Sequence, residues 1–480
     1  MPFEPVIGLE IHAHLLTATK IFCGCPTTFG AAPNTHACPV CPGMPGALPV
    51  LNRHAVELAL KAALALGCTI HETSVFARKN YFYPDLPKGY QISQYERPLA
   101  TGGHIDLIRG AVTTRVGVTR IHMEEDAGKS LHHGTADSDR STALDFNRAG
   151  VPLIEIVTEP DLRSASDAAD CFSHLREVLV ALGVNDGNME EGSLRCDANV
   201  SIRPSSAHPF GTKAEVKNVN SFRFLQKALA YEIERQIEVV ESGGRVRQET
   251  RLWDSETGQT ESMRSKEEAH DYRYFPEPDL PPLTVDAAWI AAVRATLPEL
   301  PEARKARMIA AYALSDYDAE QLVRVIAGAA GYFEAAVQAG ASPKAASNWI
   351  QGEIRRKLNE AGAEDLAACP IAADRLAELA QLTERGVISS SVAKDVFEKM
   401  WSTGASAGRI VDAEGLGQIG DASALRSLVD AVISGHPDPV AQYRGGRTAT
   451  LGFLVGQVMK ASGGKANPKL VSDLMKSALG

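Results

Sequence analysis

The runs RIHMEEDAGKS, residues 120–130, and DFNRAGVPLIEIVTEPD, residues 145–161, form the stretch around which the rest of the chain is organised. The second run contains LIEIV, an apolar segment that predicts a buried strand, where a carboxylate is seldom a surface group. Neighbouring carboxylates repel one another, and burial increases that repulsion, so a cation is expected among them. We therefore predict an oxygen-rich Mg2+ site, although a solvated acidic turn is the alternative for the first run. The acidic residues concerned are Glu124, Glu125, Asp126 and Glu155.

The N-terminal segment VIGLEIHAHL, residues 6–15, alternates between apolar and polar side chains. Such alternation predicts a half-buried strand with one face toward a core. Glu10, His12 and His14 share the other face, so Glu10 and His12 project together from one strand. Two interpretations stay open from the pattern alone, namely a solvated face and a face that contributes to a site.

Four of the eight cysteines form two close pairs, Cys23 with Cys25 and Cys38 with Cys41, separated by twelve residues. In a chain that looks cytoplasmic, this spacing favours a tetrahedral zinc site with four thiolate ligands. A disulfide or free thiols are the alternatives. Because four cysteines leave no open coordination position, such a zinc ion would be structural.

Other polar side chains lie where they would contact a ligand. The segment at residues 79–96 reads as a loop, in which Lys79 and Tyr81 would pair with a phosphate and stack on a base, or else form part of a small aromatic core. Arg195 and Lys217 fall on the polar faces of two further predicted strands, which would either cup a ligand or face solvent.

The pattern of elements predicts an α+β protein. Strands and helices at 55–67, 167–182 and 221–240 suggest a large, mostly antiparallel sheet that forms a cradle. From about residue 286 the composition becomes helical, apart from an expected loop at residues 402–420. We predict a cradle domain with the active site and the zinc knuckle, a helical domain and a small all-helical tail domain. Their boundaries are 1–290, 291–405 and 406–480.

Composition limits the classes of function. The chain has 480 residues, a net charge of -10, 44% apolar residues and no run of 18 apolar residues. We expect a cytoplasmic protein without a membrane span or signal peptide. The tail is the exception to the acidic charge, and its basic side chains would either contact a polyanion or form a solvated face. The candidates for contact with RNA are Arg444, Arg447, Lys460 and Lys465.

Four long runs carry a resemblance that covers essentially the whole chain: HMEEDAGKS, NRAGVPLIEIVTEPD, MEEGSLRCDANVSIRP and DYRYFPEPDLPPL. In this order they resemble the signature segments of the B subunits of aspartyl/glutamyl-tRNA amidotransferases. The resemblance implies ATP-dependent transamidation of Glu-tRNA(Gln) or Asp-tRNA(Asn), with phosphorylation of the side-chain carboxylate before ammonia attacks it. It also implies two partners, namely the A subunit, which is an amidase that supplies the ammonia, and the small C subunit.

The same resemblance assigns roles to residues. It implies that His12, Glu125 and Glu155 hold Mg2+, or Mn2+, since imidazole is a less typical Mg2+ ligand. Glu10 and Glu124 are then catalytic candidates near that ion or on a second one. It also implies that the tail domain docks tRNA. Candidates for contact with ATP or other anionic groups are Lys79, Tyr81, Arg148, Arg195 and Lys217.

Two alternatives to the enzymatic interpretation stay open. One is a non-catalytic tRNA-binding scaffold with a structural zinc site. The other is a zinc-bearing, ATP-dependent ligase that acts on a small carboxylate. The acidic residues together with His12 distinguish the transamidase from the scaffold, and the basic tail distinguishes it from the small-molecule ligase.

Overall fold

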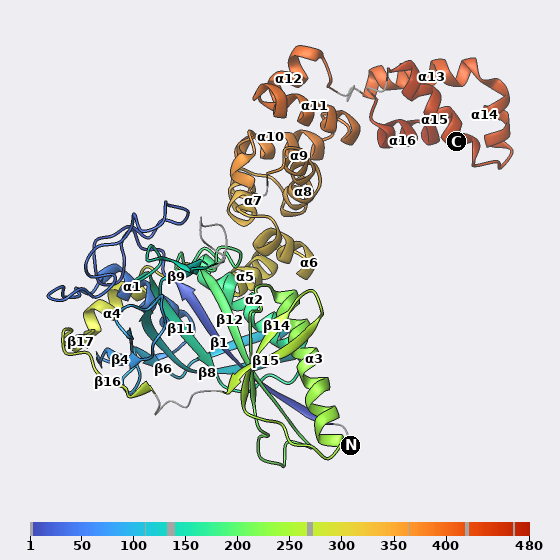
Figure 1. Cartoon of the computed structure of the whole chain (residues 1–480). Coiled ribbons are helices and arrows are strands. Elements are labelled where there is room, and N and C mark those ends of the chain that lie inside the picture. Colours follow the sequence, from blue (N-terminus) through green and yellow to red (C-terminus); the bar gives the residue numbers. More distant parts are fainter. Residues whose placement is uncertain are drawn as a thin grey trace. The chain divides into compact units, whose positions relative to one another are not determined.

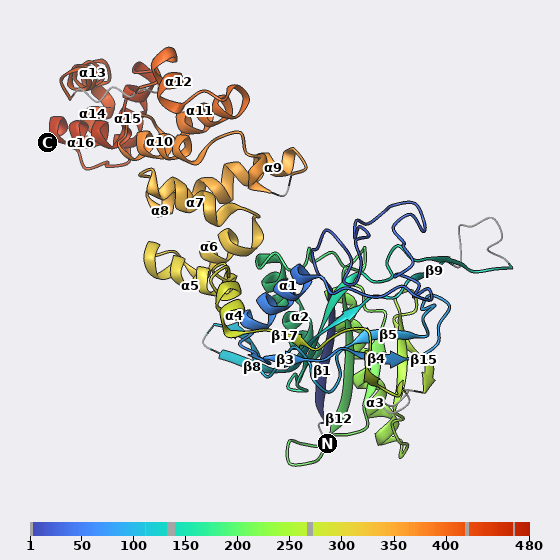
Figure 2. The ribbon, with the colours of Figure 1, turned by 90° about the vertical axis from the view of Figure 1, so that its left-hand side faces the viewer.

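The computed structural model describes residues 3–110, 112–131, 140–265, 272–363, 365–417, 422–463 and 466–480. The chain divides into two compact units, Met1–Leu300 and Pro301–Gly480 (Figures 1 and 2). Strands and helices build the first unit and helices build the second, which confirms the predicted α+β class. The proposed further division of the helical part at residue 405 stays a prediction. Within the described ranges, no helix is long and apolar enough to cross a membrane.

Ten strands of the described part form the main sheet of the first unit, and their neighbours are antiparallel except β13 and β14. β1 lies near the middle, between β11 and β12. The strands across the sheet are β15 (Gln259–Ser265), β14 (Glu249–Asp254), β13 (Ala214–Lys217), β12 (Leu194–Arg203), β1 (Glu4–His14), β11 (Pro152–Thr158), β8 (Val112–Glu125), β6 (Ala100–Thr101) and β2 (Thr69–Ile70), with β7 (His104–Arg109) also paired to β8.

The predicted alternation of β1 is confirmed. Ile7, Leu9 and Ile11 are fully buried, whereas His12 and His14 on the opposite face are only partly covered. Antiparallel partners that lie directly opposite each other point to the same face, so the register of β1 sets the polar face of its neighbours as well. The position of β1 therefore decides which side chains meet on the uncovered side of the sheet.

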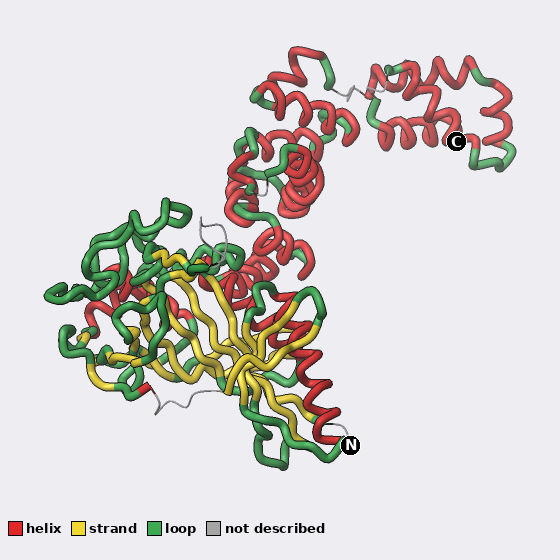
Figure 3. The backbone as a smooth tube through the Cα atoms, viewed as in Figure 1, coloured by secondary structure: helices red, strands yellow, loops and turns green. Residues whose placement is uncertain are grey.

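Three helices, α1 (Arg53–Ala65), α2 (Ala165–Ala181) and α3 (Phe222–Glu241), pack with the apolar face in one hydrophobic core. Figure 3 shows α3 as a red helix beside the yellow strands. Ser221 caps the start of α3, because its hydroxyl accepts a hydrogen bond from the Phe224 amide at 3.0 Å. A fourth helix, α4 (Ala287–Arg294), packs on α1.

A smaller sheet stands beside β8, and here the structure differs from the predicted loop at residues 79–96. β4 (Ala77–Asn80) pairs with β5 (Tyr90–Ser93) and with β16 (Phe275–Pro276). The residues between β4 and β5, which include both prolines of that segment, and residues 94–96 lie outside the strands. Two short pairs complete the unit, β9 (Lys129–Leu131) with β10 (Ala143–Asp145) and β3 (Thr73–Ser74) with β17 (Leu283–Thr284).

The helical unit has two separate hydrophobic cores, one within 308–411 and the other within 425–479. The expected loop at 402–420 is partly wrong, because it contains α12. The α-helices of this unit are α5 (Pro301–Tyr312), α6 (Asp316–Glu320), α7 (Ala329–Gln338), α8 (Pro343–Trp349), α9 (Arg355–Glu360), α10 (Ala373–Glu384), α11 (Ser390–Thr403), α12 (Ala407–Glu414), α13 (Ala422–Gly435), α14 (Pro437–Arg444), α15 (Thr450–Ala461) and α16 (Pro468–Leu479).

Candidate functional site

One row of side chains crosses four adjacent strands on the polar face of the main sheet. His12 in β1 lies opposite Arg195 in β12 and opposite Glu155 in β11, and Glu155 lies opposite His122 in β8. Their side chains therefore point to the same side of the sheet. This register brings together residues that are more than one hundred positions apart in the sequence.

Two buried carboxylates and two imidazoles meet in this row. The Nε2 atom of His122 lies 3.1 Å from Glu124 Oε1 and 3.4 Å from Glu155 Oε2, and the Nε2 atom of His12 lies 3.5 Å from Glu155 Oε2. Glu124 also accepts hydrogen bonds from Ser93 at 2.5 Å and from Gln91 at 3.1 Å. The two carboxylates therefore face imidazoles and neutral donors at close range.

The pKa values in the row follow from this geometry. Burial by itself lowers the pKa of His122, but the neighbouring Glu155 and Glu124 carboxylates raise it to about 9. Burial raises the pKa of Glu155, yet His122 and His12 bring it well below its usual value. Glu124 and Glu155 repel each other, so the pair attracts a cation.

The structure differs from the predicted metal set at one residue. Ligand atoms of His12, Glu124 and Glu155 all lie within 4.8 Å of one another, which fits a divalent cation with oxygen and imidazole ligands. Glu125 points to the opposite face of β8, where it pairs with Lys88 and accepts a hydrogen bond from the Ile92 amide at 2.9 Å. Successive residues of a strand point to opposite faces, so Glu125 cannot join the cluster while Glu124 does.

Asp126 lies at the centre of a second cluster, beside the first. Its Oδ2 atom lies 2.7 Å from His14 Nε2, 2.9 Å from Arg195 and 3.6 Å from Arg148. Burial raises the pKa of Asp126, but Arg195 and Arg148 lower it well below its usual range. The predicted anion-binding candidates Arg148 and Arg195 are thus brought together around one carboxylate, and each has a side chain that is 36% exposed.

Lys79 and Tyr81 line a cavity that Glu124 and Asp126 also line. The Nζ atom of Lys79 lies 5.1 Å from the ring centre of Tyr272 and 5.9 Å from that of Tyr81. Burial lowers the pKa of Lys79, but Glu124 and other acidic neighbours raise it above its usual value, so this lysine is a cation. Next to them the rings of Tyr95 and Tyr274 stack with centres 4.1 Å apart.

The remaining candidates on the sheet lie along the same face. The ammonium group of Lys217 lies 2.5 Å from Asp197 Oδ2 and 3.6 Å from Glu215 Oε1. Glu10 accepts a hydrogen bond from Asn199 at 2.7 Å. Both Lys217 and Glu10 lie on the wall of the cavity that His12 also lines.

Two adjoining cavities open over this face. One has a volume of about 300 Å3 and the other about 460 Å3. His12, Lys79 and Glu124 line both, so the carboxylate–imidazole cluster lies where the cavities meet. The first is walled by tyrosines, and the second by Asp126 and its arginines. The arrangement can hold two polar ligands in contact beside one cation.

Sequence reasoning missed several residues of the site, and one signal was available. The run RIHMEED, residues 120–126, has the alternation of a strand that also predicts β1. That alternation places Arg120, His122 and Glu124 on one face. It therefore predicts Glu124, and not Glu125, as the metal ligand and His122 as its neighbour. Tyr272 and Tyr274 come from a segment whose pairing with β4 has no local signal, because it follows β4 by almost two hundred residues.

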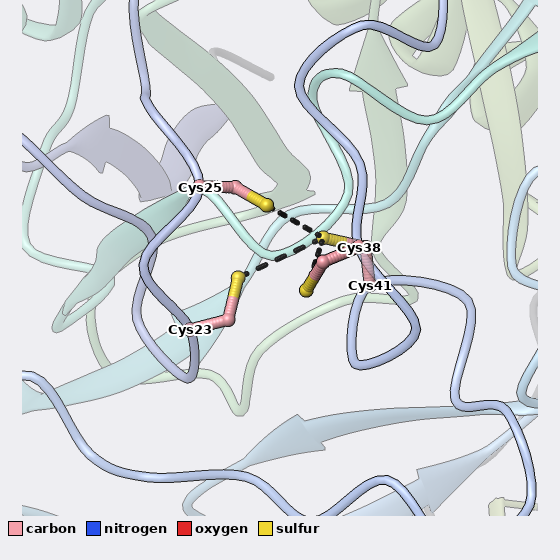
Figure 4. A group of neighbouring side chains, drawn as sticks. All are labelled: Cys23, Cys25, Cys38 and Cys41. Atoms are coloured by element: carbon pink, nitrogen blue, oxygen red, sulfur yellow. Dashed lines mark hydrogen bonds between the residues drawn. The ribbon is translucent and has the colours of Figure 1, made fainter.

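The four cysteines of the predicted zinc site converge. Cys41 Sγ lies 3.7 Å from Cys23 Sγ and 4.0 Å from both Cys25 Sγ and Cys38 Sγ (Figure 4). A tetrahedral zinc ion with Zn–S bonds of about 2.3 Å would separate its sulfur atoms by about 3.8 Å. A disulfide would need about 2.05 Å, and the cysteines are free thiols. The cluster therefore can bind zinc in a closed site.

The basic residues of the tail are spread over its helices and loops. Arg444 ends α14, Lys460 lies in the last turn of α15, and Arg447 lies between those helices. Arg444 donates a hydrogen bond to the Leu479 carbonyl at 3.3 Å. Lys465 lies outside the described residues. Contact of these side chains with RNA stays a prediction.

Comparison with known proteins gives matches along the chain. The family described as GatB/GatE catalytic domain matches residues 5–291, and the family described as GatB domain matches residues 331–479. The chain is 54% identical over 479 residues to the aspartyl/glutamyl-tRNA(Asn/Gln) amidotransferase B subunit of Geobacter sulfurreducens, covering 100% of both chains. It is 55% identical over 482 residues to the corresponding protein of Anaeromyxobacter sp., covering 100% of this chain and 99% of the other. The chain therefore belongs to the family of aspartyl/glutamyl-tRNA(Asn/Gln) amidotransferase B subunits.

Proposed function

We propose that this chain catalyses the ATP-dependent transamidation of tRNA that carries a misattached glutamate or aspartate. The relatives are named as B subunits of amidotransferases that act on aspartyl- and glutamyl-tRNA. Their similarity to this chain extends over the whole length, so it covers every strand that contributes to the carboxylate–imidazole cluster. The alternative of a non-catalytic scaffold is not favoured, because a scaffold has no need for two buried carboxylates at a cavity.

One observation carries the proposal: Glu124 and Glu155 are buried next to each other, with His12 and His122 as neighbours, at the meeting point of two polar cavities. ATP in one cavity and the aminoacyl end of the tRNA in the other would bring a γ-phosphate to a carboxylate. The carboxylate oxygen attacks the γ-phosphorus, the bond to the β-phosphate oxygen breaks, and ADP leaves. Ammonia then attacks the carbonyl carbon of the acyl phosphate, the carbon–oxygen bond to phosphate breaks, and the proton that the nitrogen loses passes to the leaving phosphate.

His12, Glu124 and Glu155 are the residues that would hold Mg2+, replacing the predicted set that included Glu125. A bound Mg2+ would offset phosphate charge and align the in-line transfer. The imidazole ring of His122 lies against both carboxylates and orients them toward His12. Glu10 lies two residues before His12 on the same face of β1 and remains a candidate for a second ion or for contact with a water ligand.

The cations around the cavities match the charges of the proposed ligands. Arg148 and Arg195 have partly exposed side chains, and their guanidinium groups suit phosphate oxygens. Lys79 is partly buried beside two tyrosine rings and interacts with Glu124, so it would balance the charge of a transferring phosphoryl group. Tyr81 and Lys217 complete the proposed contacts to ATP or the aminoacyl group.

The name of the relatives as B subunits implies a complex, and we propose that its other members are the amidase, or A, subunit together with the small C subunit. The amidase would supply ammonia from glutamine. We also propose that the tail domain binds tRNA through Arg444, Arg447, Lys460 and Lys465. A cytoplasmic location fits the free cysteines, because thiols persist in a reducing compartment.

The test is a tRNA-dependent amidation assay on the reconstituted complex, with ammonium in place of glutamine. His12→Ala and Glu124→Gln should abolish ATP hydrolysis that depends on Glu-tRNA or Asp-tRNA, while tRNA still binds. Glu234→Gln, which changes an exposed carboxylate of α3, is the matched control and should leave turnover unchanged. Full turnover in both cluster variants would exclude the proposed assignment.

A further inference from the structure

Lys20 is a fully buried lysine next to the cysteine cluster. Its ammonium group donates to the His36 carbonyl at 2.7 Å, to Cys41 Sγ at 3.3 Å and to the Phe146 carbonyl at 3.1 Å. A lysine has three N–H donors, so these contacts use all of them. The lysine thereby joins the cysteine loop to a second loop that is far away in the sequence.

The charge of Lys20 requires a negative partner. Among its hydrogen-bond acceptors in the described part of the chain, none is a carboxylate, and Cys41 is the group that can be ionised. A buried ammonium group without a counter-ion is strongly unfavourable. A zinc ion with four thiolate ligands carries a net charge of about -2, which Lys20 partly offsets. The buried lysine and the thiolate site therefore stabilise each other.

The loop that Lys20 reaches, residues 145–150, carries Arg148. The cysteine loop is fastened to it at further points: the Phe146 amide donates to Asn34 Oδ1 at 2.8 Å, and the His36 amide donates to Asn147 Oδ1 at 2.8 Å. Each contact comes from the residues between the two cysteine pairs. A metal ion at the four cysteines would thus close the loop, residues 26–37, that is hydrogen-bonded to residues 146 and 147.

The same loop supports the second cluster. The guanidinium group of Arg148 donates to the Ala127 carbonyl at 3.1 Å and to the Gly128 carbonyl at 2.7 Å, and the Gly150 amide donates to the Asp126 carbonyl at 2.9 Å. A shift of residues 145–150 would therefore move Arg148 relative to Asp126. That movement would change the wall of the larger cavity.

We propose that Lys20 is a positioning residue that couples metal occupancy of the four-cysteine site to the position of Arg148 on the cavity wall. The physical coupling is independent of the reaction. Its consequence for catalysis rests on the transamidase function proposed for this chain, in which Arg148 would contact phosphate. The zinc site then acts on ligand binding through the hydrogen bond from Lys20 to Phe146, without taking part in the chemistry.

The first experiment measures the release of zinc from the purified full chain into a coloured chelator. Lys20→Met keeps a similar length but removes the charge, and should release zinc about 10- to 100-fold faster than the unaltered protein, as loss of a ligand's outer partner typically does. Lys20→Arg restores the charge and should bring the rate back toward the unaltered one. Lys227→Met, which changes an exposed lysine of α3, is the control and should change nothing. Equal release rates for all four proteins would overturn the role of Lys20.

The second experiment needs no variant. Amide hydrogen exchange is followed in the unaltered chain with zinc bound and after removal of zinc by a chelator. Exchange should rise at residues 34–36 and 145–151, whereas α10 should be unaffected. Unchanged exchange at 145–151 after complete zinc loss would refute the coupling. Neither experiment uses ATP or tRNA, so failure of the transamidase function would leave both results readable.

Discussion

Glu124 and Glu125 are adjacent, acidic and buried, yet we expect opposite results when each is changed to glutamine. Glu125 forms a buried pair with Lys88, whose side chain is 7% exposed. Glu125→Gln would leave the Lys88 ammonium group without a counter-charge, and breaking such a pair by removing one partner costs about 3–5 kcal/mol. Glu124→Gln instead removes the repulsion from Glu155, which offsets the loss of the hydrogen bonds from Ser93 and Gln91, and His122 keeps Glu155 as its counter-ion.

The structure gives the size of the expected shift in melting temperature. The first unit spans 300 residues, and unfolding entropy is about 2.1 cal/mol/K per residue, which gives about 0.6 kcal/mol/K. Glu125→Gln should therefore lower the melting temperature of this unit by about 5–8 °C. Glu124→Gln should change it by no more than about 2 °C.

Magnesium separates the two variants further. A ligand present at about 100 times its dissociation constant stabilises the protein that binds it by about 2.7 kcal/mol, equivalent here to about 4 °C. The unaltered chain and Glu125→Gln should both show this rise, and Glu124→Gln should not. Differential scanning calorimetry with and without Mg2+ measures both effects, with Glu234→Gln as the control. The opposite result would be that Glu124→Gln keeps the Mg2+-dependent rise, whereas Glu125→Gln loses that rise and melts at the same temperature as the unaltered chain. In that case Glu125, and not Glu124, would point into the cavity from β8.

Three further predictions concern other parts of the chain. Burial raises the pKa of Glu334, but hydrogen bonds from Arg304 and Arg307 lower it overall. The ionised carboxylate therefore stabilises the folded helical unit above pH 4.5, and this stabilisation is lost as the pH falls below that value. Calorimetry of the helical unit from about pH 6 to about pH 3 should show this loss, and Glu334→Gln should reduce it. Arg444→Ala with Arg447→Ala should weaken tRNA binding and reduce the salt slope by about 1 for each phosphate group that is no longer bound, as measured by filter binding at several salt concentrations; an unchanged slope would contradict the tail assignment. Deletion of the residues after about 405 should weaken tRNA affinity while Mg2+ still raises the melting temperature of the first unit, and equal tRNA affinity would refute the role of the tail.

Much of the fold follows from local patterns. The alternation of β1 predicts a strand with His12 and Glu10 on one face, and the helix predicted at residues 221–240 corresponds to α3, because such periods depend on residues close in sequence. The four cysteines could be grouped for the same reason. These predictions concern contacts that short segments already contain.

The site depends on register between distant strands, which local patterns do not contain. The pairing of His12 with Glu155 brings the carboxylate of β11 beside β1, and the further pairing of Glu155 with His122 brings that histidine into the row. The prediction of Glu125 as a ligand ignored this parity. Tyr272 reaches the cavity through the pairing of β16 with β4, a contact across almost two hundred residues that no local signal predicts.

The three consecutive acidic residues at the end of β8, Glu124, Glu125 and Asp126, have three different surroundings. Glu124 points into the cavity and shares the charge of Glu155, Glu125 points to the other face and is neutralised by Lys88, and Asp126 follows the strand and is held between arginines. Glu125 and Asp126 are thus each paired with a lysine or with arginines, whereas Glu124 and Glu155 share the imidazole of His122 between two carboxylates. Because an ion binds where negative charge is left over, the neutralised neighbours direct it to Glu124 and Glu155. Leu153→Lys, which would place an ammonium group on the strand opposite Glu124, should therefore abolish Mg2+ binding without moving the strand. If Mg2+ still raised the melting temperature of this variant, the unneutralised charge would not be what attracts the ion.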